Sequence, residues 1–140
     1  MMMQVGVWLD HRKAVVVRMV DGEEHLQTIL SDVEKHVRPA GGARSKLPYG
    51  PQDIMKEDSR ERKFRQHLAR WYDEVAGHLQ GADELLVFGP GEAKTEFRKH
   101  IEGTPLRDKL SGIETVDKMT DGQIAAKVRK FYIPGKYPVA

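Results

Sequence analysis

The pattern Gly41-Gly42-Ala43-Arg44-Ser45-Lys46 is the part of this chain best suited to binding an anion. Two adjacent glycines let the backbone approach a ligand closely. Arginine and lysine side chains supply the positive charge and the N–H donors that phosphate groups attract. The candidate phosphate contacts of this segment are Arg38, Arg44 and Lys46, and Gly41 and Gly42 provide its backbone freedom. An ordinary flexible surface loop is the alternative explanation of the same composition.

A second group of cationic side chains follows in an arginine-rich stretch, where Arg62 and Arg65 are the candidate contacts. Residues 33–70 hold ten Lys and Arg against five Asp and Glu, a net charge of +5, whereas the remainder carries −3 and the whole chain +2. A local excess of this kind steers anionic partners, although a solvated charged face has the same composition. We expect the two basic groups to form one surface that binds an anionic partner.

Two further patterns suggest chemistry at the ends of predicted strands. Gly89-Pro90-Gly91 with Lys94 follows an apolar strand and opens a helix, so Gly89, Gly91 and Lys94 form a candidate anion site. A purely structural turn explains these residues as well. The carboxylates Asp10, Glu84 and Asp117 are conceivable ligands for the divalent ions of a nuclease, but their places at different strand ends do not suggest that they converge.

Composition narrows the remaining possibilities. The absence of cysteine excludes disulfides and thiolate chemistry, and the six histidines lack close metal-ligand spacing, so we predict no catalytic residue, metal or cofactor. No apolar run approaches the roughly 18–20 residues that span a bilayer. At 39% hydrophobic and 31% charged residues, the chain is expected to be a cytoplasmic globular protein with one domain over residues 1–133 and a tail over residues 134–140.

The elements that must position these residues follow from hydrophobic periodicity. Alternating and β-branched residues predict strands at residues 4–9, 13–20 and 23–30, and Asp21-Gly22 is a hairpin turn signal. A continuous apolar run predicts a strand at residues 85–88 that is covered on both faces. Another strand at residues 112–116 and helices around Phe97 and Val128 complete an α/β fold of order βββαβαβα, a mixed sheet with an antiparallel N-terminal meander.

An amphipathic helix is predicted at residues 59–80, with Asp58 in a capping-box pattern at its start. Residues 31–55 show no helical or strand period, which predicts a loop longer than the roughly 12–15 residues usual in compact domains. Phe64 and Trp71 are expected to fill the core, and Tyr49 in the loop is the better candidate for stacking on a base.

Five features of the chain point to a known family: the order of elements, the run from Trp8 to Ala14, the Gly41-Gly42 loop, the arginine-rich helix and the run from Leu86 to Lys94. Together they resemble the middle domain of archaeo-eukaryotic peptide-chain release factors and Pelota-like proteins. Stand-alone bacterial relatives of that superfamily are the most similar in organisation. The resemblance implies a ribonuclease H-like fold and a setting in translation. It also implies that the loop reaches the acceptor end of transfer RNA on the ribosome.

The loop departs from the release-factor pattern at its third position. Release factors carry Gly-Gly-Gln, whereas Ala43 follows Gly41-Gly42 here, and alanine has no side-chain donor or acceptor with which to orient water. We therefore expect an accessory of translation that binds the ribosome or transfer RNA without hydrolysing peptidyl-tRNA. A metal-dependent nuclease or ester hydrolase and a protein-interaction module remain the alternatives.

Overall fold

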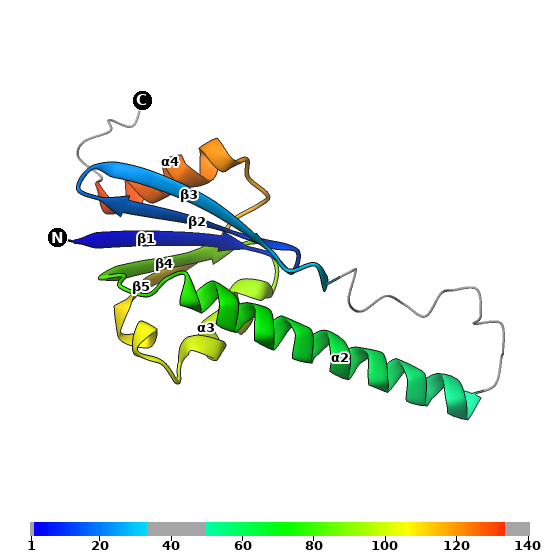
Figure 1. Ribbon diagram of the computed structural model, residues 1–140. Coiled ribbons are helices and arrows are strands. Elements are labelled where there is room, and N and C mark those ends of the chain that lie inside the picture. The colour runs from blue at the N-terminus through cyan, green and yellow to red at the C-terminus, as the bar shows by residue number, and fades with distance from the viewer. Residues whose placement is uncertain (1, 34–49, 134–140) are drawn as a thin grey trace.

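The computed structural model describes residues 2–33 and 50–133, and for residues 50–58 it describes the path of the backbone alone. Five strands form one sheet in the order β3-β2-β1-β4-β5, with helices on both of its faces (Figure 1). The α/β class and the mixed sheet are confirmed, and the order of elements matches the prediction apart from an additional short 3-10 helix, η2 (Pro105–Lys109). No helix in the described ranges is long and apolar enough to cross a membrane.

An antiparallel meander forms one side of the sheet. It consists of β1 (Met3–Leu9), β2 (Lys13–Val20) and β3 (Glu23–Leu30). Asp21 and Gly22 join β2 to β3 with φ values of 52° and 84°, the left-handed conformation that a two-residue hairpin turn requires. The predicted strands and their turn are therefore confirmed to within one residue.

Two parallel strands complete the sheet on the other side of β1. These are β4 (Glu84–Gly89), which pairs with β1, and β5 (Leu110–Thr115), which pairs with β4. β4 is internal and its residues from Leu85 to Phe88 have no exposed surface, as the continuous apolar run predicted. Because β1, β4 and β5 are parallel, their carboxyl ends lie at the same edge of the sheet.

Each face of the sheet carries its own hydrophobic cluster. Helices α2 (Gly50–Gly77) and α3 (Ala93–Ile101) cover one face, where they pack on Val5, Val7 and Val87 of the strands. Helix α4 (Asp121–Tyr132) covers the other face, where Trp8 and Phe88 lie (Figure 1). This division follows from the strand period of two, because neighbouring side chains point to opposite faces.

Helix α4 lies very close to the central strand. A Cβ atom added at Gly6 of β1 would lie 2.4 Å from Cγ2 of Val128, so the absence of a side chain at Gly6 allows the approach. A capping box holds the start of α4: the Thr120 hydroxyl accepts from the Gln123 N–H at 3.2 Å, and the Gln123 side chain accepts from the Thr120 N–H at 2.9 Å.

The predicted bounds of α2 were wrong at both ends. The helix begins at Gly50 and ends at Gly77, so residues 50–55 belong to it rather than to the loop, and Asp58 lies inside it rather than at its cap. Pro51 suits a first helical turn, and residues 52–57 are mostly good helix formers, but they show no apolar stripe that would reveal the helix. At the other end Leu79 stays buried in a turn that Gly81 closes with φ 90°.

Candidate nucleic-acid interface

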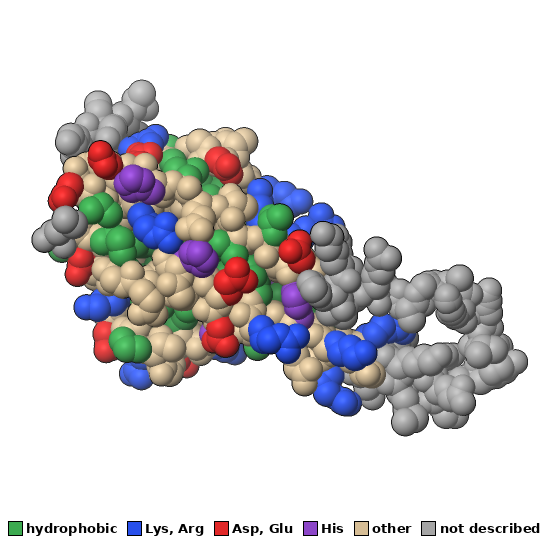
Figure 2. Space-filling view, viewed as in Figure 1, with side chains coloured by type: hydrophobic (Ala, Val, Ile, Leu, Met, Phe, Trp, Pro, Cys, Tyr) green, Lys and Arg blue, Asp and Glu red, His purple; other side chains and the backbone are tan. Residues whose placement is uncertain are grey.

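The N-terminal part of α2 projects beyond the edge of the sheet where β1 and β4 end (Figure 1). Residues 59–70 of this helix hold five Lys and Arg and one acidic residue, Glu61. We call the side chains Arg62, Lys63, Arg65 and Arg70 the basic face, and all four are exposed. Figure 2 shows Lys and Arg side chains gathered on this part of the helix.

The arrangement of the basic face follows from helical geometry. At 100° per residue, Arg62 and Arg70 lie opposite the buried stripe that contains Leu68 and Val75. Arg65 Nη1 lies 3.8 Å from Glu61 Oε2, but both side chains are about 70% exposed, so solvent screens this ion pair. Among the residues that the structure describes, Arg62, Lys63 and Arg70 have no ion pair, and their charge is therefore available to an anionic partner.

The predicted contacts that precede α2 in the chain belong to residues 34–49, which the structure does not describe. Arg38, Gly41, Gly42, Arg44 and Lys46 lie outside the described residues, as does Tyr49. Arg62 and Arg65 are the predicted contacts that the structure describes, and both are exposed on α2. Binding by any of these residues remains a prediction.

Polar contacts with other elements hold the base of α2 in place. The Tyr72 hydroxyl donates to Glu96 Oε1 of α3 at 2.7 Å, and the same oxygen accepts from His11 Nε2 at 2.9 Å. Further toward its N-terminus, α2 contacts the end of β3, where His67 Nε2 donates to the Ser31 carbonyl at 2.5 Å. These contacts join α2 to the β1–β2 turn, to α3 and to β3, and so they fix the direction in which the basic face projects.

Tyr72 is the buried member of this network. Burial, followed by the hydrogen bond to Glu96 and the negative charge of Glu96, raises the pKa of the Tyr72 phenol well above its usual range. The hydroxyl therefore stays protonated and acts as a fixed donor. Sequence reasoning missed this network because His11, Tyr72 and Glu96 are far apart in the chain and no local pattern links them.

The Gly89-Pro90-Gly91 turn has clear structural requirements for its residues. Gly89 has φ 155°, and a Cβ atom there would lie 2.3 Å from the carbonyl oxygen of Leu9, whereas Gly91 has φ 64°. Lys94 is 8% exposed and its ammonium group donates to the Gly91 carbonyl at 2.5 Å. These contacts favour the structural explanation of the turn, and anion binding at Gly89, Gly91 and Lys94 remains untested.

The carboxylates considered for a nuclease do not come together. Glu84 pairs with Gln4 at the start of the parallel strands, whereas Asp10 follows the end of β1, about 20 Å away at roughly 3.3 Å per residue. Asp10 Oδ1 accepts from the backbone N–H groups of Arg12 and Lys13, at 2.8 and 2.9 Å, and so shapes the turn. Among the side chains of residues 2–33 and 59–133, no three from His, Asp or Glu lie close enough to hold a metal ion.

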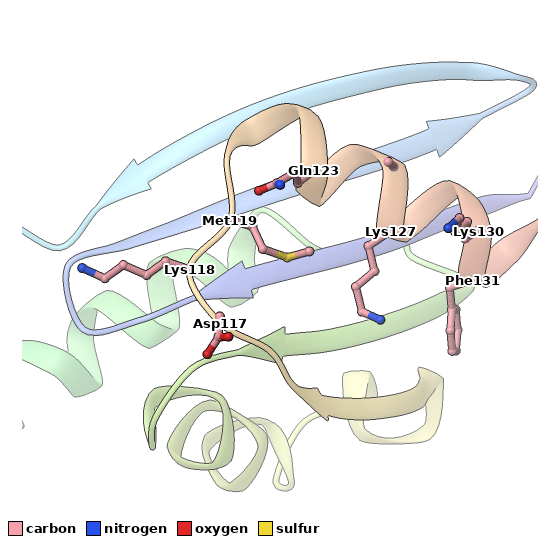
Figure 3. Close-up of a pocket in the computed structure, with 8 residues that line it drawn as sticks. Asp117, Lys118, Met119, Gln123, Lys127, Lys130 and Phe131 are labelled. Atoms are coloured by element: carbon pink, nitrogen blue, oxygen red, sulfur yellow. The ribbon is translucent and has the colours of Figure 1, made fainter. Parts of the chain in front are cut away.

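A cavity of about 610 Å³ lies beside α4. Figure 3 shows Lys127 and Phe131 extending from α4 toward the sheet, with Met119 on the segment before the helix. Lys127 Nζ is 2.6 Å from Glu114 Oε1, so the charge that this lysine brings to the cavity is already compensated. Lys118 and Lys130 also line the cavity, together with Asp117, so its lining holds three lysines and one acidic residue against the four cations of the basic face.

A second cavity, of about 430 Å³, lies between α2 and α3 near the base of the basic face. Trp71 is buried in the core as predicted, at 3% exposure, whereas Phe64 packs at the edge of the core and is partly exposed on the wall of this cavity.

Comparison with solved structures shows the fold that this arrangement belongs to. No protein-family model and no curated protein sequence matches the chain. The structure is similar to the Pelota protein of Thermoplasma acidophilum, with a TM-score of 0.54, 15% identity, and coverage of 96% of this chain and 33% of that one.

It is also similar to the archaeal translation termination factor aRF1, with a TM-score of 0.51, 12% identity, and coverage of 96% of this chain and 40% of that one. The chain thus spans between one third and two fifths of the length of these proteins. The resemblance to a domain shared by Pelota and release factors is confirmed at the level of the fold.

Proposed function

We propose that this protein is a translation-associated accessory that binds ribosomal or transfer RNA through the basic face of α2 and the Gly41-Gly42 segment. The observation that carries the proposal is the projecting helix, which has four exposed cations and one acidic residue over residues 59–70. The likeness of the fold to part of a translation termination factor supports the same setting. A cation on a projecting helix can reach a phosphate backbone without a conformational change in the sheet.

Peptidyl-tRNA hydrolysis is not part of this function. Ala43 offers no hydrogen-bond donor or acceptor at the position where release factors carry glutamine, so no side chain there can orient a water molecule or stabilise a developing oxyanion. Ribosome binding and peptidyl-tRNA hydrolysis can be measured in separate assays. We expect the purified protein to bind ribosomes and to leave peptidyl-tRNA intact.

Co-sedimentation with ribosomes over a salt series tests the proposal. Contacts to several phosphates make the affinity fall steeply as the salt concentration rises. Each contact adds about 0.7–0.9 to the slope of log affinity against log salt concentration. Replacement of Arg44 and Lys46 by alanine should weaken binding and make the slope shallower.

Arg107→Gln provides a matched control, because Arg107 is exposed on η2, at the opposite end of the sheet from the start of α2. Absence of binding by the wild-type protein at low salt would exclude the proposed function.

A further inference from the structure

The cavity between α2 and α3 combines aromatic walls with cations at its edge. Its walls include Phe64, Arg65 and Tyr72 of α2, and Glu96, Lys99 and His100 of α3. Tyr72 lies seven and eight positions after Arg65 and Phe64, and Lys99 and His100 lie three and four positions after Glu96, so each set shares one side of its helix. Arg65 belongs to the basic face as well, and the cavity is therefore continuous with the surface proposed to bind RNA.

The apolar lining of the cavity comes from Phe64, Leu68, Ala69 and Tyr72 of α2. Phe64 is only partly buried, and its ring meets His11 edge-on with the centroids 5.8 Å apart. Tyr72 forms the inner wall, and its ring centroid lies 5.8 Å from that of His100. The partly exposed ring of Phe64 offers a base a surface to stack on, because every nucleobase has a face that stacks on aromatic rings.

The cations suit the phosphates that flank a base. Lys99 is exposed and has no ion pair with any residue in the described ranges. Arg65 has only the exposed contact with Glu61, 3.8 Å away. Both side chains are therefore able to contact a backbone that enters and leaves the cavity.

Glu96 adds a means of distinguishing bases. Its Oε1 accepts hydrogen bonds from Tyr72 and His11, whereas its Oε2 has no hydrogen bond within the part of the chain that the structure describes. An ionised carboxylate is an acceptor only, so this oxygen suits a base that carries an amino group. Cytosine presents such a group at N4, and uracil has none there.

We propose that this cavity holds one unpaired base of single-stranded RNA, with Arg65 and Lys99 on the adjoining phosphates. The inference rests on the proposed function and adds the kind of RNA that is bound. Bases in a duplex are stacked and paired, so they cannot enter the cavity, and the site selects single strands.

Fluorescence anisotropy with three labelled probes tests the inference: a 12-nucleotide oligocytidylate, an oligouridylate of equal length, and an RNA duplex of 12 base pairs. Phe64→Leu keeps an apolar side chain but removes the ring. From the usual effect of losing one stacked base, we expect its affinity for oligocytidylate to fall roughly 5- to 150-fold. Binding of the duplex should be unchanged.

Two further comparisons separate the parts of the site. Lys99→Gln should make the salt dependence for oligocytidylate shallower by about 0.7, the contribution of one phosphate contact on a single strand. The wild-type protein should bind oligocytidylate several-fold more tightly than oligouridylate. Circular dichroism and a thermal melt of each variant check that the fold is retained.

The results that overturn the inference differ from those that overturn the proposed function. If Phe64→Leu binds oligocytidylate as the wild type does, or loses single-stranded and duplex RNA equally, the cavity does not hold a base. If Phe64→Leu keeps its RNA affinity but loses a protein that the wild type retains from nuclease-treated extract, the cavity is a protein-docking site. Failure of the wild type to bind any of the three probes, or ribosomes, contradicts both proposals.

Discussion

Replacement of Gly6 by alanine tests the packing of α4 on the sheet. The added methyl carbon would lie 2.4 Å from Cγ2 of Val128, well inside ordinary van der Waals contact, so the helix or the strand must move. Overpacking of this kind costs about 1–3 kcal/mol of unfolding free energy. Because β1 is central and Val128 is fully buried, no solvent-exposed group can absorb the displacement.

Val128→Ala is the second substitution of a double-mutant cycle with Gly6→Ala, and it removes the clashing methyl group. Alone, it should cost about 2–3 kcal/mol, from about 0.8 kcal/mol for each carbon removed and a term for the cavity. In the double variant the new methyl of residue 6 occupies part of that cavity. We therefore expect the double variant to be more stable than the sum of the single effects predicts, by about 1–3 kcal/mol.

Urea unfolding at 25 °C, followed by circular dichroism, measures these differences if the slope with denaturant is the same in all four proteins. Effects that add to within about 0.5 kcal/mol would show that residues 6 and 128 are not in contact. The reasoning about how α4 lies on β1 would then be wrong.

Three other predictions concern the turn after β4, the buried tyrosines and the cap of α4. Gly89→Ala should destabilise the protein by about 2–6 kcal/mol, because the alanine would combine a positive φ with a clash against the backbone. Gly91→Ala should cost only about 1–2 kcal/mol, because its Cβ would meet no other atom within 4 Å, and urea unfolding compares the two variants. Burial raises the pKa of both Tyr72 and Tyr132, so the unfolded chain loses these protons first and the free energy of unfolding must fall as the pH rises above about 10. Thermal melts at pH 8 and 10.5 should show this loss of stability, and the loss should be smaller in a variant with phenylalanine at both positions. Thr120→Ala should lower the unfolding free energy by about 0.5–2 kcal/mol by removing the cap of α4, and no change would mean that the capping box is not formed in solution.

The strands were predictable from sequence because their signals are local. Alternation and β-branched residues marked β2 and β3, and Asp21-Gly22 fixed the register between them. The start of α2 was not predictable in the same way, because the helix there projects from the sheet and needs no apolar stripe. A pattern search based on periodicity finds only helices that bury one face.

The candidate site was predictable only in part. The arginines at positions 62 and 65 could be identified from composition and helical spacing, and the structure places both on the exposed side of α2. The cavity beside them was not predictable, because it depends on the contact of α2 with α3 and on the meeting of Tyr72 and Glu96. Phe64 has the spacing of a core residue, and only its position at the edge of the core leaves its ring partly exposed.

The salt dependence of transfer RNA binding tests the central claim most directly. Filter binding at several salt concentrations would compare the wild type, the double variant with glutamine in place of Arg62 and Arg65, and the control Arg107→Gln. We predict that the double variant binds more weakly and that its logarithmic slope is shallower by about 1.4–1.8, or about 0.7–0.9 for each lost phosphate contact, while the control matches the wild type. Equal slopes for all three proteins would contradict a role of the basic face of α2 in binding RNA.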